Sequence, residues 1–479
     1  MRPVIQAAAG WICIAILTTG AVSCVKKPDP KAAAAHHQNM IEAAVWGMPI
    51  VSFDAMRQAY FRDGQAQYND IIYYSKPADS KLQITTPNAS SRYVYFHFNL
   101  KNGPVVLEIP PAAGAGLFGS VLDAWQVPLV DVGPAGSDRG KGGVYVLLPP
   151  GYRGEMPEKS IPVPFRTVNG YGVLRAIPED NGGEAIARAL ALVHQLKLYP
   201  LSQATEPPDQ KFIDMSEKLF DGIVRFDETF YTSLARMIDE EPVLPRDQAM
   251  MEKLRTIGIV KGTTYQQGAA ARESLHTAAD EVHTFFMNQA TAEGAPYWAG
   301  GNWRSASAAG AGTGFTFEEN GKLNEEARGV FYFLACAPPA KLGKATMYLC
   351  AYVDSAGQPL LGDSTYTLRV PRRVPAKQFW AVTVYDAETA AFLKDSPRVE
   401  INSYQDLQMN PDGSVDLYFG PLPPQDKASN WVSTSSGKWF AFFRFYGPDT
   451  AILNRTWRLP DIIKVPPPAS PTTPGPPTS

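Results

Sequence analysis

Residues 92–100 read RYVYFHFNL, and this stretch fixes the kind of structure expected around it. Its side chains alternate between two faces, the two-residue period of a β-strand. One face is apolar and predicts a contact with a core: Val94, Phe96 and Phe98. The opposite face is polar and aromatic: Tyr93, Tyr95, His97 and Asn99. That second face suits a binding surface, with a plain solvent-exposed sheet face as the alternative.

Similar runs continue on both sides of this strand. They include GPVVLEIP (103–110), GVYVLLPP (143–150) and NGYGVLRAI (169–177), each bounded by glycine or proline. Short strands at this spacing, separated by turn residues, are typical of a β-sandwich. We therefore expect an N-terminal β-sandwich over residues 39–178, entered through a helix that Gly47 and Pro49 interrupt.

The pattern changes after residue 178. GGEAIARALALVHQL (182–196) and AAARESLHTAADEVHTFFMNQ (269–289) have the spacing of amphipathic helices. Strand-like runs then return, from FYFLAC (331–336) through FWAVTVYD (379–386) to WFAFFRFYG (439–447). The sequence thus predicts a helical segment over 179–325 and a jelly-roll-like β-domain over 326–465. The expected fold is multi-domain and mainly β with a helical insert, followed by a disordered Pro-rich tail over 466–479.

The first residues have the features of an export signal. Arg2 is followed by an apolar run without charge until Lys26, and small residues precede Cys24. Such a pattern indicates a lipoprotein signal peptide over 1–23, lipidation of Cys24 and an exposed tether over 24–38. The location expected from it is the cell envelope, on the periplasmic face of the outer membrane. An ordinary signal peptide or a membrane anchor is the alternative.

Composition narrows the classes of partner. The 479 residues carry a formal net charge of -3, so no basic face is expected and nucleic acid is excluded as a partner. GAGLFG (114–119) matches a dinucleotide fingerprint, but β-like residues follow it where the fingerprint needs a helix. No cofactor is therefore predicted.

Two further patterns contain the residue types of a metal site and of a disulfide. His276, Asp280 and His283 share one flank of a predicted helix and are weak metal candidates, with a solvated edge as the alternative, so no metal site is predicted. Cys336 and Cys350 flank a short turn-like segment and could form a disulfide in an oxidising compartment, with two buried thiols as the alternative. The acidic NPDG sequence (410–413) has the residues of a tight hairpin turn, not those of a calcium loop.

Two parts of the chain resemble known families. FWAVTVYDAETAAFL, DGSVDLYFGPLPP and TWRLPDI are similar to the DUF1214 domain, and TPNASSRYVYFHFNLKNGPVVLEIP is similar to the DUF1254 domain. The resemblance implies the same fold: a β-sandwich, a helical insert and a jelly-roll-like domain. This sequence departs from the family in NASSRY (88–93), where Ser90 replaces the expected Asp and Ser91 the expected Thr.

The resemblance also implies a set of recurrent polar and aromatic positions. These are Asn88, Arg92, Tyr93, Trp125, Trp380, Tyr385, Arg398, Asn430, Trp431, Arg444 and Tyr446. From this set we take Asn88, Arg92, Tyr93, Trp125, Asn430, Trp431, Arg444 and Tyr446 as candidate ligand-binding residues, and the strand pattern adds Tyr95. Core or turn roles are the alternative at each position.

These observations support three functional hypotheses. The first is an exported, lipid-anchored protein that binds a small molecule or glycan in a cleft between its two β-domains. The second is a periplasmic hydrolase acting on such a ligand by general acid–base chemistry, whose catalytic residues the sequence does not identify. The third is a non-catalytic envelope assembly protein, for which a homodimer is one form.

Overall fold

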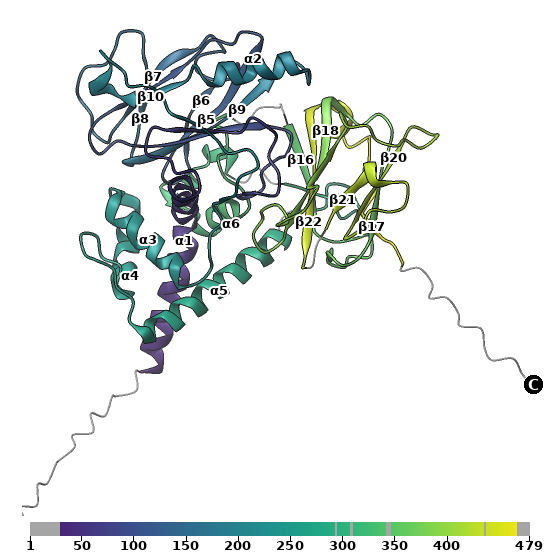
Figure 1. Cartoon of the computed structure of the whole chain (residues 1–479). Helices are drawn as coiled ribbons and strands as arrows, with labels where there is room; N and C mark the ends of the chain where they lie inside the picture. Colours follow the sequence, from purple (N-terminus) through teal and green to yellow (C-terminus); the bar gives the residue numbers. More distant parts are fainter. Residues whose placement is uncertain (1–28, 293–294, 307–309, 342–345, 435–436, 467–479) are drawn as a thin grey trace, which may run out of the picture.

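A computed structural model describes residues 29–292, 295–306, 310–341, 346–434 and 437–466. Two β-sandwiches lie side by side, and a group of helices fills the space beneath and between them (Figure 1). The fold is multi-domain and mainly β with a helical insert, which confirms the predicted fold class.

The first sandwich has a six-stranded and a four-stranded sheet. The larger sheet has the order β11 (Phe212–Asp214), β1 (Ile71–Tyr73), β3 (Arg92–Asn99), β9 (Asn169–Pro178), β5 (Ala115–Asp123) and β6 (Pro128–Val132). The smaller sheet has the order β10 (Lys197–Pro200), β4 (Val105–Ile109), β7 (Gly143–Leu148) and β8 (Ile161–Pro164). Val94, Phe96 and Phe98 of β3 pack into the core between these sheets, with Leu107 and Leu147 on the other side. A two-stranded ladder of β2 (Leu82–Gln83) and β12 (Phe220–Asp221) lies outside both sheets.

The second sandwich is built in the same way from the C-terminal part of the chain. Its five-stranded sheet has the order β13 (Arg304–Ser305), β16 (Thr346–Ala351), β22 (Trp439–Pro448), β18 (Ala376–Asp386) and β19 (Glu400–Asn402). The facing sheet has the order β21 (Trp431–Ser433), β20 (Val415–Gly420), β17 (Tyr366–Val370) and β23 (Ile463–Lys464). Alternate residues such as Phe443, Val382 and Leu417 fill the core between them. A small hairpin of β14 (Glu318–Glu319) and β15 (Lys322–Leu323) precedes this domain.

The helices form a third core that contacts the outer faces of both large sheets. They are α1 (Pro30–Arg62), α3 (Glu228–Glu240), α4 (Gln248–Thr256), α5 (Ala269–Ala292) and α6 (Glu325–Leu334), while α2 (Gly183–Val193) packs on the first sandwich and α7 (Thr450–Leu453) on the second. Phe53 of α1 lies in this core together with Tyr171 of β9 and Tyr385 of β18. Each large sheet is therefore buried on both faces over much of its area.

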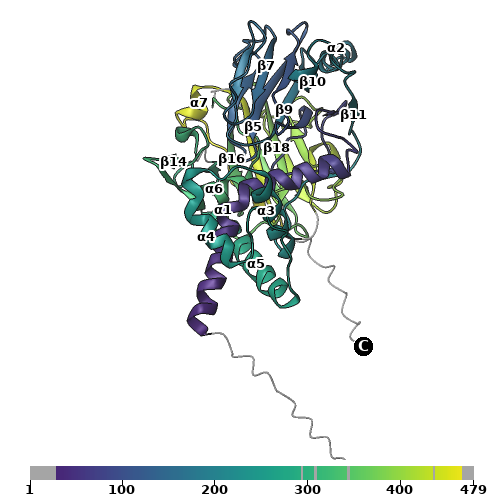
Figure 2. The ribbon, with the colours of Figure 1, turned by 90° about the vertical axis from the view of Figure 1, so that its left-hand side faces the viewer.

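Helix α1 differs from its prediction in two ways. It begins at Pro30, so residues 30–38 are helical although mostly exposed, where a tether was expected. The Asp29 carboxylate caps the helix by accepting from the Lys31 amide at 3.1 Å, and the alanine-rich sequence that follows has high helix propensity. The helix is also continuous through Gly47 and Pro49, and Figures 1 and 2 show two stretches that run in different directions. The expected interruption is thus a bend, as a proline inside a helix produces.

Two other segments also differ from the prediction. FYFLAC was expected to be a strand, but residues 331–334 belong to helix α6, whose N-cap Asn324 accepts from the Ala327 amide at 3.0 Å. Residues 197–221, expected in the helical segment, contain β10, β11 and β12, which pair with strands of the first sandwich. Strands of two to four residues are too short to show a two-residue period in the sequence.

The segment predicted to be a signal peptide, Cys24 and most of the Pro-rich tail lie outside the described residues. Within the described ranges, the structure has no helix whose length and apolar character would let it cross a bilayer.

Candidate functional site

The two β-sandwiches meet at a buried polar cluster. Residues 88–91 immediately precede β3. They contact the outer face of the second domain, where Ala89 and Ser90 donate hydrogen bonds to the Glu400 carboxylate of β19. Ser90 Oγ donates to Glu400 Oε1 at 2.9 Å, and the Ala89 amide donates to Glu400 Oε2 at 3.1 Å. Thr383 of β18 donates its hydroxyl to the same Oε2 at 2.8 Å. Glu400 is only 4% exposed, so these donors replace the water that burial removes.

Arg444 of β22 holds the same loop from a neighbouring strand. Its Nη2 donates to the Thr86 carbonyl at 3.2 Å and to the Tyr385 hydroxyl at 2.5 Å, while Nη1 donates to Thr383 Oγ1 at 2.5 Å. Tyr385 in turn donates to the Pro87 carbonyl. Burial would lower the pKa of Arg444, but the neighbouring tyrosines and Glu400 outweigh it and raise that pKa, so the guanidinium stays charged.

Aromatic and cationic side chains border this cluster. Arg175 of β9 lies over the Tyr93 ring with its Cζ 5.3 Å from the centroid, and its charge also acts on Tyr348 and Tyr446 of the second domain. Tyr446 stacks on Phe379 with centroids 3.9 Å apart, and Phe379 lies 4.8 Å from Tyr404. Phe379, Tyr404 and Tyr446 are called the aromatic stack below. Tyr404 is 60% exposed, so the stack runs from the buried polar cluster into solvent.

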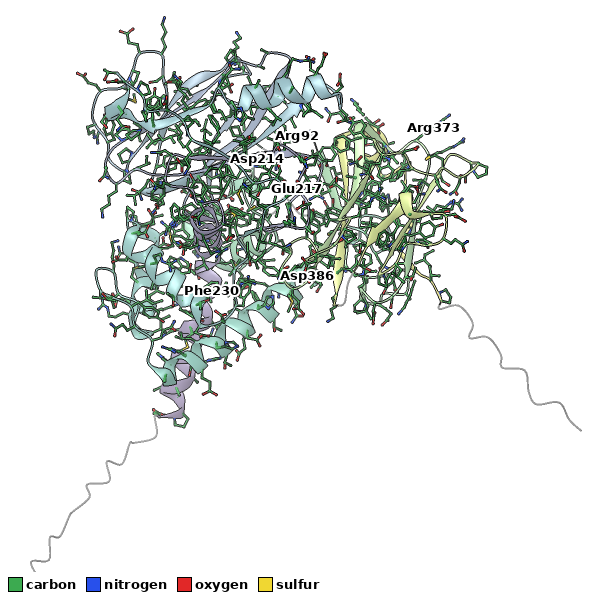
Figure 3. The ribbon with its side chains drawn as sticks, in the orientation of Figure 1. Arg92, Asp214, Glu217, Phe230, Arg373 and Asp386 are labelled. Carbon is green, nitrogen blue, oxygen red and sulfur yellow. The ribbon has the colours of Figure 1, made fainter. Side chains whose placement is uncertain are left out.

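Four of the candidate residues gather at this junction. Asn88, Tyr93, Arg444 and Tyr446 all belong to it: the Asn88 amide donates to the Tyr93 hydroxyl at 3.0 Å, and Asn88 Oδ1 accepts from the Ser90 amide at 3.2 Å. Arg92 lies beside the cluster but donates from Nε to the Ser75 carbonyl at 3.1 Å, and burial lowers its pKa. Figure 3 labels Arg92 close to Asp214, on the side of the first domain that faces the second.

The other candidates lie elsewhere. Tyr95 is buried at 7% exposure, and Trp125 packs edge-on against Trp46 with centroids 4.7 Å apart. Asn430 and Trp431 bond within the second domain, Asn430 to the Gln408 carbonyl at 2.9 Å and Trp431 to the Gly420 carbonyl at 2.9 Å. Trp380 packs in the second sandwich core, and Arg398 donates to the Ser429 carbonyl at 2.8 Å. These positions have the core and turn roles given above as the alternative.

The alternative given for the polar face of β3, a solvent-exposed sheet face, is wrong. Tyr95 and His97 are 7% and 0% exposed because α1 covers them, and Tyr93, at 6%, lies under Arg175 at the domain junction. His97 accepts from or donates to the Tyr95 hydroxyl at 2.5 Å and packs on Phe53 of α1, 5.1 Å between centroids. The two-residue period of the strand was predicted correctly. The sequence of the strand alone does not show that helix α1, whose Phe53 lies about 40 residues earlier in the chain, covers its polar face.

The weak metal candidates and the cysteines are also separate. His276 Nδ1 lies 3.3 Å from Glu228 Oε2, and His283 Nε2 lies 2.6 Å from the Glu388 carbonyl oxygen. Within the described ranges, no three His, Cys, Asp or Glu side chains are grouped as metal ligands. Cys336 and Cys350 are both free, so the suggested disulfide is absent. Cys336 follows a helix, not the paired strand that the suggestion assumed, and its Sγ faces the Thr85 carbonyl at 3.8 Å.

Sequence reasoning missed three members of the junction: Thr383, Glu400 and Arg175. Glu400 lies in a three-residue strand and Arg175 alternates with apolar residues, so each has the pattern of a solvent-facing side chain. Their partners come from the other domain, and only the docking of the two sheets identifies them. Ser90 was noted only as a departure from the family and was not among the candidate residues, and the structure places its hydroxyl on Glu400.

The comparisons with known proteins agree with this architecture. The family model "Protein of unknown function (DUF1254)" matches residues 68–200, and "Protein of unknown function (DUF1214)" matches residues 345–450. The first match covers most of the first sandwich and the second match most of the second. The chain belongs to the proteins that contain these two domains. A search of curated proteins found no match.

Two solved structures resemble the chain at low sequence identity. The VPA0106 protein from Vibrio parahaemolyticus has a TM-score of 0.53 at 16% identity, and the alignment covers 90% of this chain and 100% of that one. A putative uncharacterized protein from Burkholderia cenocepacia has a TM-score of 0.39 at 12% identity, covering 91% of this chain and 96% of that one. The first similarity supports the fold and does not extend to function.

Proposed function

We propose that this chain is an exported, lipid-anchored envelope protein that binds a small molecule or glycan at the junction of its two β-domains. The observation that carries the binding proposal is the aromatic stack, which leads from exposed Tyr404 to Tyr446 beside the buried Ser90–Glu400 contact. Aromatic faces next to hydroxyl, carboxylate and guanidinium groups suit a ligand that has both apolar faces and hydroxyl groups. The N-terminal sequence supports export and anchoring.

A hydrolase is the alternative that two buried carboxyls favour. Burial raises the pKa of Asp123 to about 6 and that of Glu241 to about 7, the range of a general acid or base. However, Glu241 accepts from the Val168 and Asn169 amides, at 2.6 and 2.9 Å, and Asp123 Oδ1 accepts from the Trp125 and Val127 amides, both at 2.9 Å. Carboxylates enclosed by backbone donors hold loops in place, so binding is the better supported function.

Envelope assembly is the third hypothesis, and a homodimer would be one form of it. Exposed apolar side chains such as Leu422, at 77%, and Met409, at 58%, are compatible with a protein contact. Both side chains come from loops of the second domain.

The binding proposal is tested with the full-length protein and a panel of neutral saccharides and aromatic metabolites. A ligand that binds the folded state raises the thermal midpoint by mass action. We expect at least one compound to raise it, and Tyr404→Ala to weaken that compound's affinity by tenfold or more. Met156→Ala, which removes an exposed side chain from a loop of the first domain, is the matched control and leaves the affinity unchanged. Binding that survives Tyr404→Ala would place the ligand elsewhere.

The anchoring proposal needs a separate test in cells. Wild type is expected in the membrane fraction and to incorporate labelled fatty acid, whereas Cys24→Ser abolishes both. Equal membrane association of the two proteins would contradict a lipid anchor at Cys24.

A further inference from the structure

A groove lies in the second domain beside the loop that follows β17. It has a volume of about 460 Å³ and is lined by Arg369, Pro371, Arg372, Asp412 and Ser414. We propose that this groove binds an acidic saccharide, meaning a sugar with a carboxylate or phosphate group. The proposal concerns a second site and does not depend on the aromatic stack.

One wall of the groove is a rigid turn. Asn410 and Ser414 close it through a hydrogen bond from the Asn410 amide to the Ser414 carbonyl at 2.7 Å, and Gly413 has a φ of +82°. The Asp412 carboxylate accepts from the Ser414 amide at 2.9 Å and from its hydroxyl at 2.6 Å. Asn430, a candidate ligand-binding residue, supports this turn from below by donating to the carbonyls of Gln408 and Asp416. The polar groups of the wall are thus held in position before any ligand arrives.

Two arginines, Arg369 of β17 and Arg372 of the loop after it, also line the groove, and they differ in whether their guanidinium groups already have partners. Arg369 is engaged: its Nε donates to Ser414 Oγ at 3.1 Å, and it lies 3.5–3.6 Å from Asp412 and Asp416. Arg372 lies beside Gly413, where an added Cβ would be in ordinary contact with its Cβ at 3.4 Å. Arg372 and the adjacent Arg373 are exposed, and neither has a hydrogen bond or ion pair with the described part of the chain. Arg372 is therefore available to an external anion.

The turn and the arginines together select for a ligand with two kinds of group. A free guanidinium binds a carboxylate or phosphate through two parallel hydrogen bonds. The Ser414 hydrogen bonds lower the pKa of Asp412, so its carboxylate is ionised and accepts hydrogen bonds from hydroxyl groups. A simple anion can pair with Arg372, whereas a sugar acid or sugar phosphate can in addition donate its hydroxyl groups to Asp412.

The lining residues of the groove all belong to the second domain, and none of them is a member of the aromatic stack. Figure 3 labels Arg373 at the outer side of the second domain, away from Arg92. The two sites can therefore be tested independently in the same protein, since Tyr404→Ala removes a side chain of the junction only.

Isothermal titration of the full-length protein tests the proposal with four probes: glucuronate, glucose 6-phosphate, glucose and inorganic phosphate. We expect glucuronate or glucose 6-phosphate to bind at least tenfold more tightly than glucose or inorganic phosphate. Arg372→Ala should lower that affinity tenfold or more, Asp412→Asn should lower the preference for the sugar phosphate over inorganic phosphate, and Tyr404→Ala should change neither.

Arg153→Ala is the matched control, because Arg153 is an exposed arginine of the first domain that also has no described partner. It should leave the affinity unchanged. The proposal is overturned if the acidic sugars do not bind, if inorganic phosphate binds as tightly as glucose 6-phosphate, or if Arg153→Ala and Arg372→Ala have the same effect.

Discussion

At position 90 a serine hydroxyl lies 2.9 Å from the buried Glu400 carboxylate. The family resemblance implies an aspartate at this position, so Ser90→Asp introduces the residue that the resemblance implies and creates a pair of carboxyls. Two carboxylates in contact cannot both ionise without cost, so one pKa of the pair rises. The folded protein then binds more protons than the unfolded chain, and the stability of the variant falls as pH rises. We expect Ser90→Asp to be about 2 kcal/mol less stable than wild type at pH 8, and less destabilised at pH 5.

Urea unfolding at both pH values measures this difference. Ser90→Ala is the control, because it removes the hydrogen bond without adding a charge and should cost about 1 kcal/mol at either pH. If Ser90→Asp is as stable as wild type at pH 8, the contact with Glu400 does not exist in solution.

Glu241 gives a second pH-dependent effect at the residue scale. Burial raises its pKa from 4.5 to about 7, so folding takes up a proton between these values. The free energy of unfolding is therefore highest below about pH 4.5 and falls by up to about 3 kcal/mol as the pH rises to 7. Glu241→Gln cannot titrate, and its unfolding free energy should lack this decrease. Urea unfolding over this pH range measures both proteins. If their unfolding free energies change with pH in parallel, the prediction is wrong and the backbone donors keep Glu241 ionised throughout.

At the scale of single elements, Pro49 of α1 and Gly329 of α6 both affect the environment of one backbone carbonyl, that of Val45. Pro49 has no amide hydrogen, so the Val45 carbonyl four residues earlier lacks its usual helical partner. Gly329 of α6 lies against this carbonyl, and an added Cβ would meet it at 2.9 Å and the Phe286 ring at 2.8 Å. We therefore expect Gly329→Ala to destabilise the protein by about 1–3 kcal/mol in urea unfolding, despite the better helix propensity of alanine.

Gly183→Ala in α2 is the control for this substitution. Nothing lies within 4 Å of a Cβ at Gly183, so the change should be neutral or slightly stabilising. An equal effect of both substitutions would mean that α6 does not pack closely on α1.

Individual elements also show how far the sequence could predict the fold. Long strands such as β3, β18 and β22 were predicted because each is rich in aromatic and β-branched residues over eight or more positions. FYFLAC was misassigned because a short apolar run fits a buried helix as well as a strand. An interruption of α1 was predicted from Gly47 and Pro49, whereas the helix is continuous through both residues, because tertiary contacts surround this stretch. At the junction, Arg444 and Tyr446 were identified through the family resemblance, whereas Glu400 required the docked domains.

At the scale of the whole molecule, the free thiols lead to a prediction about redox dependence. Cys336 and Cys350 are unbonded, and burial raises the pKa of Cys350 to about 12, which leaves it as an unreactive thiol. The unfolding free energy should therefore be the same with and without reductant. Alkylation of the urea-unfolded protein without reductant, followed by peptide mass analysis, should label both cysteines. A linked peptide that contains Cys336 and Cys350 would contradict this prediction.

The contact between α1 and α6 has a consequence for the order of folding. Arg328 Nη2 donates to the Trp46 carbonyl at 2.7 Å, and these two residues are 282 positions apart in the chain. Helix α1 thus finishes burying its apolar surface only after residue 328, 282 positions beyond Trp46, has been synthesised. Until then Trp46 and its neighbours are exposed to other chains, and a partly synthesised molecule is the form most exposed to aggregation.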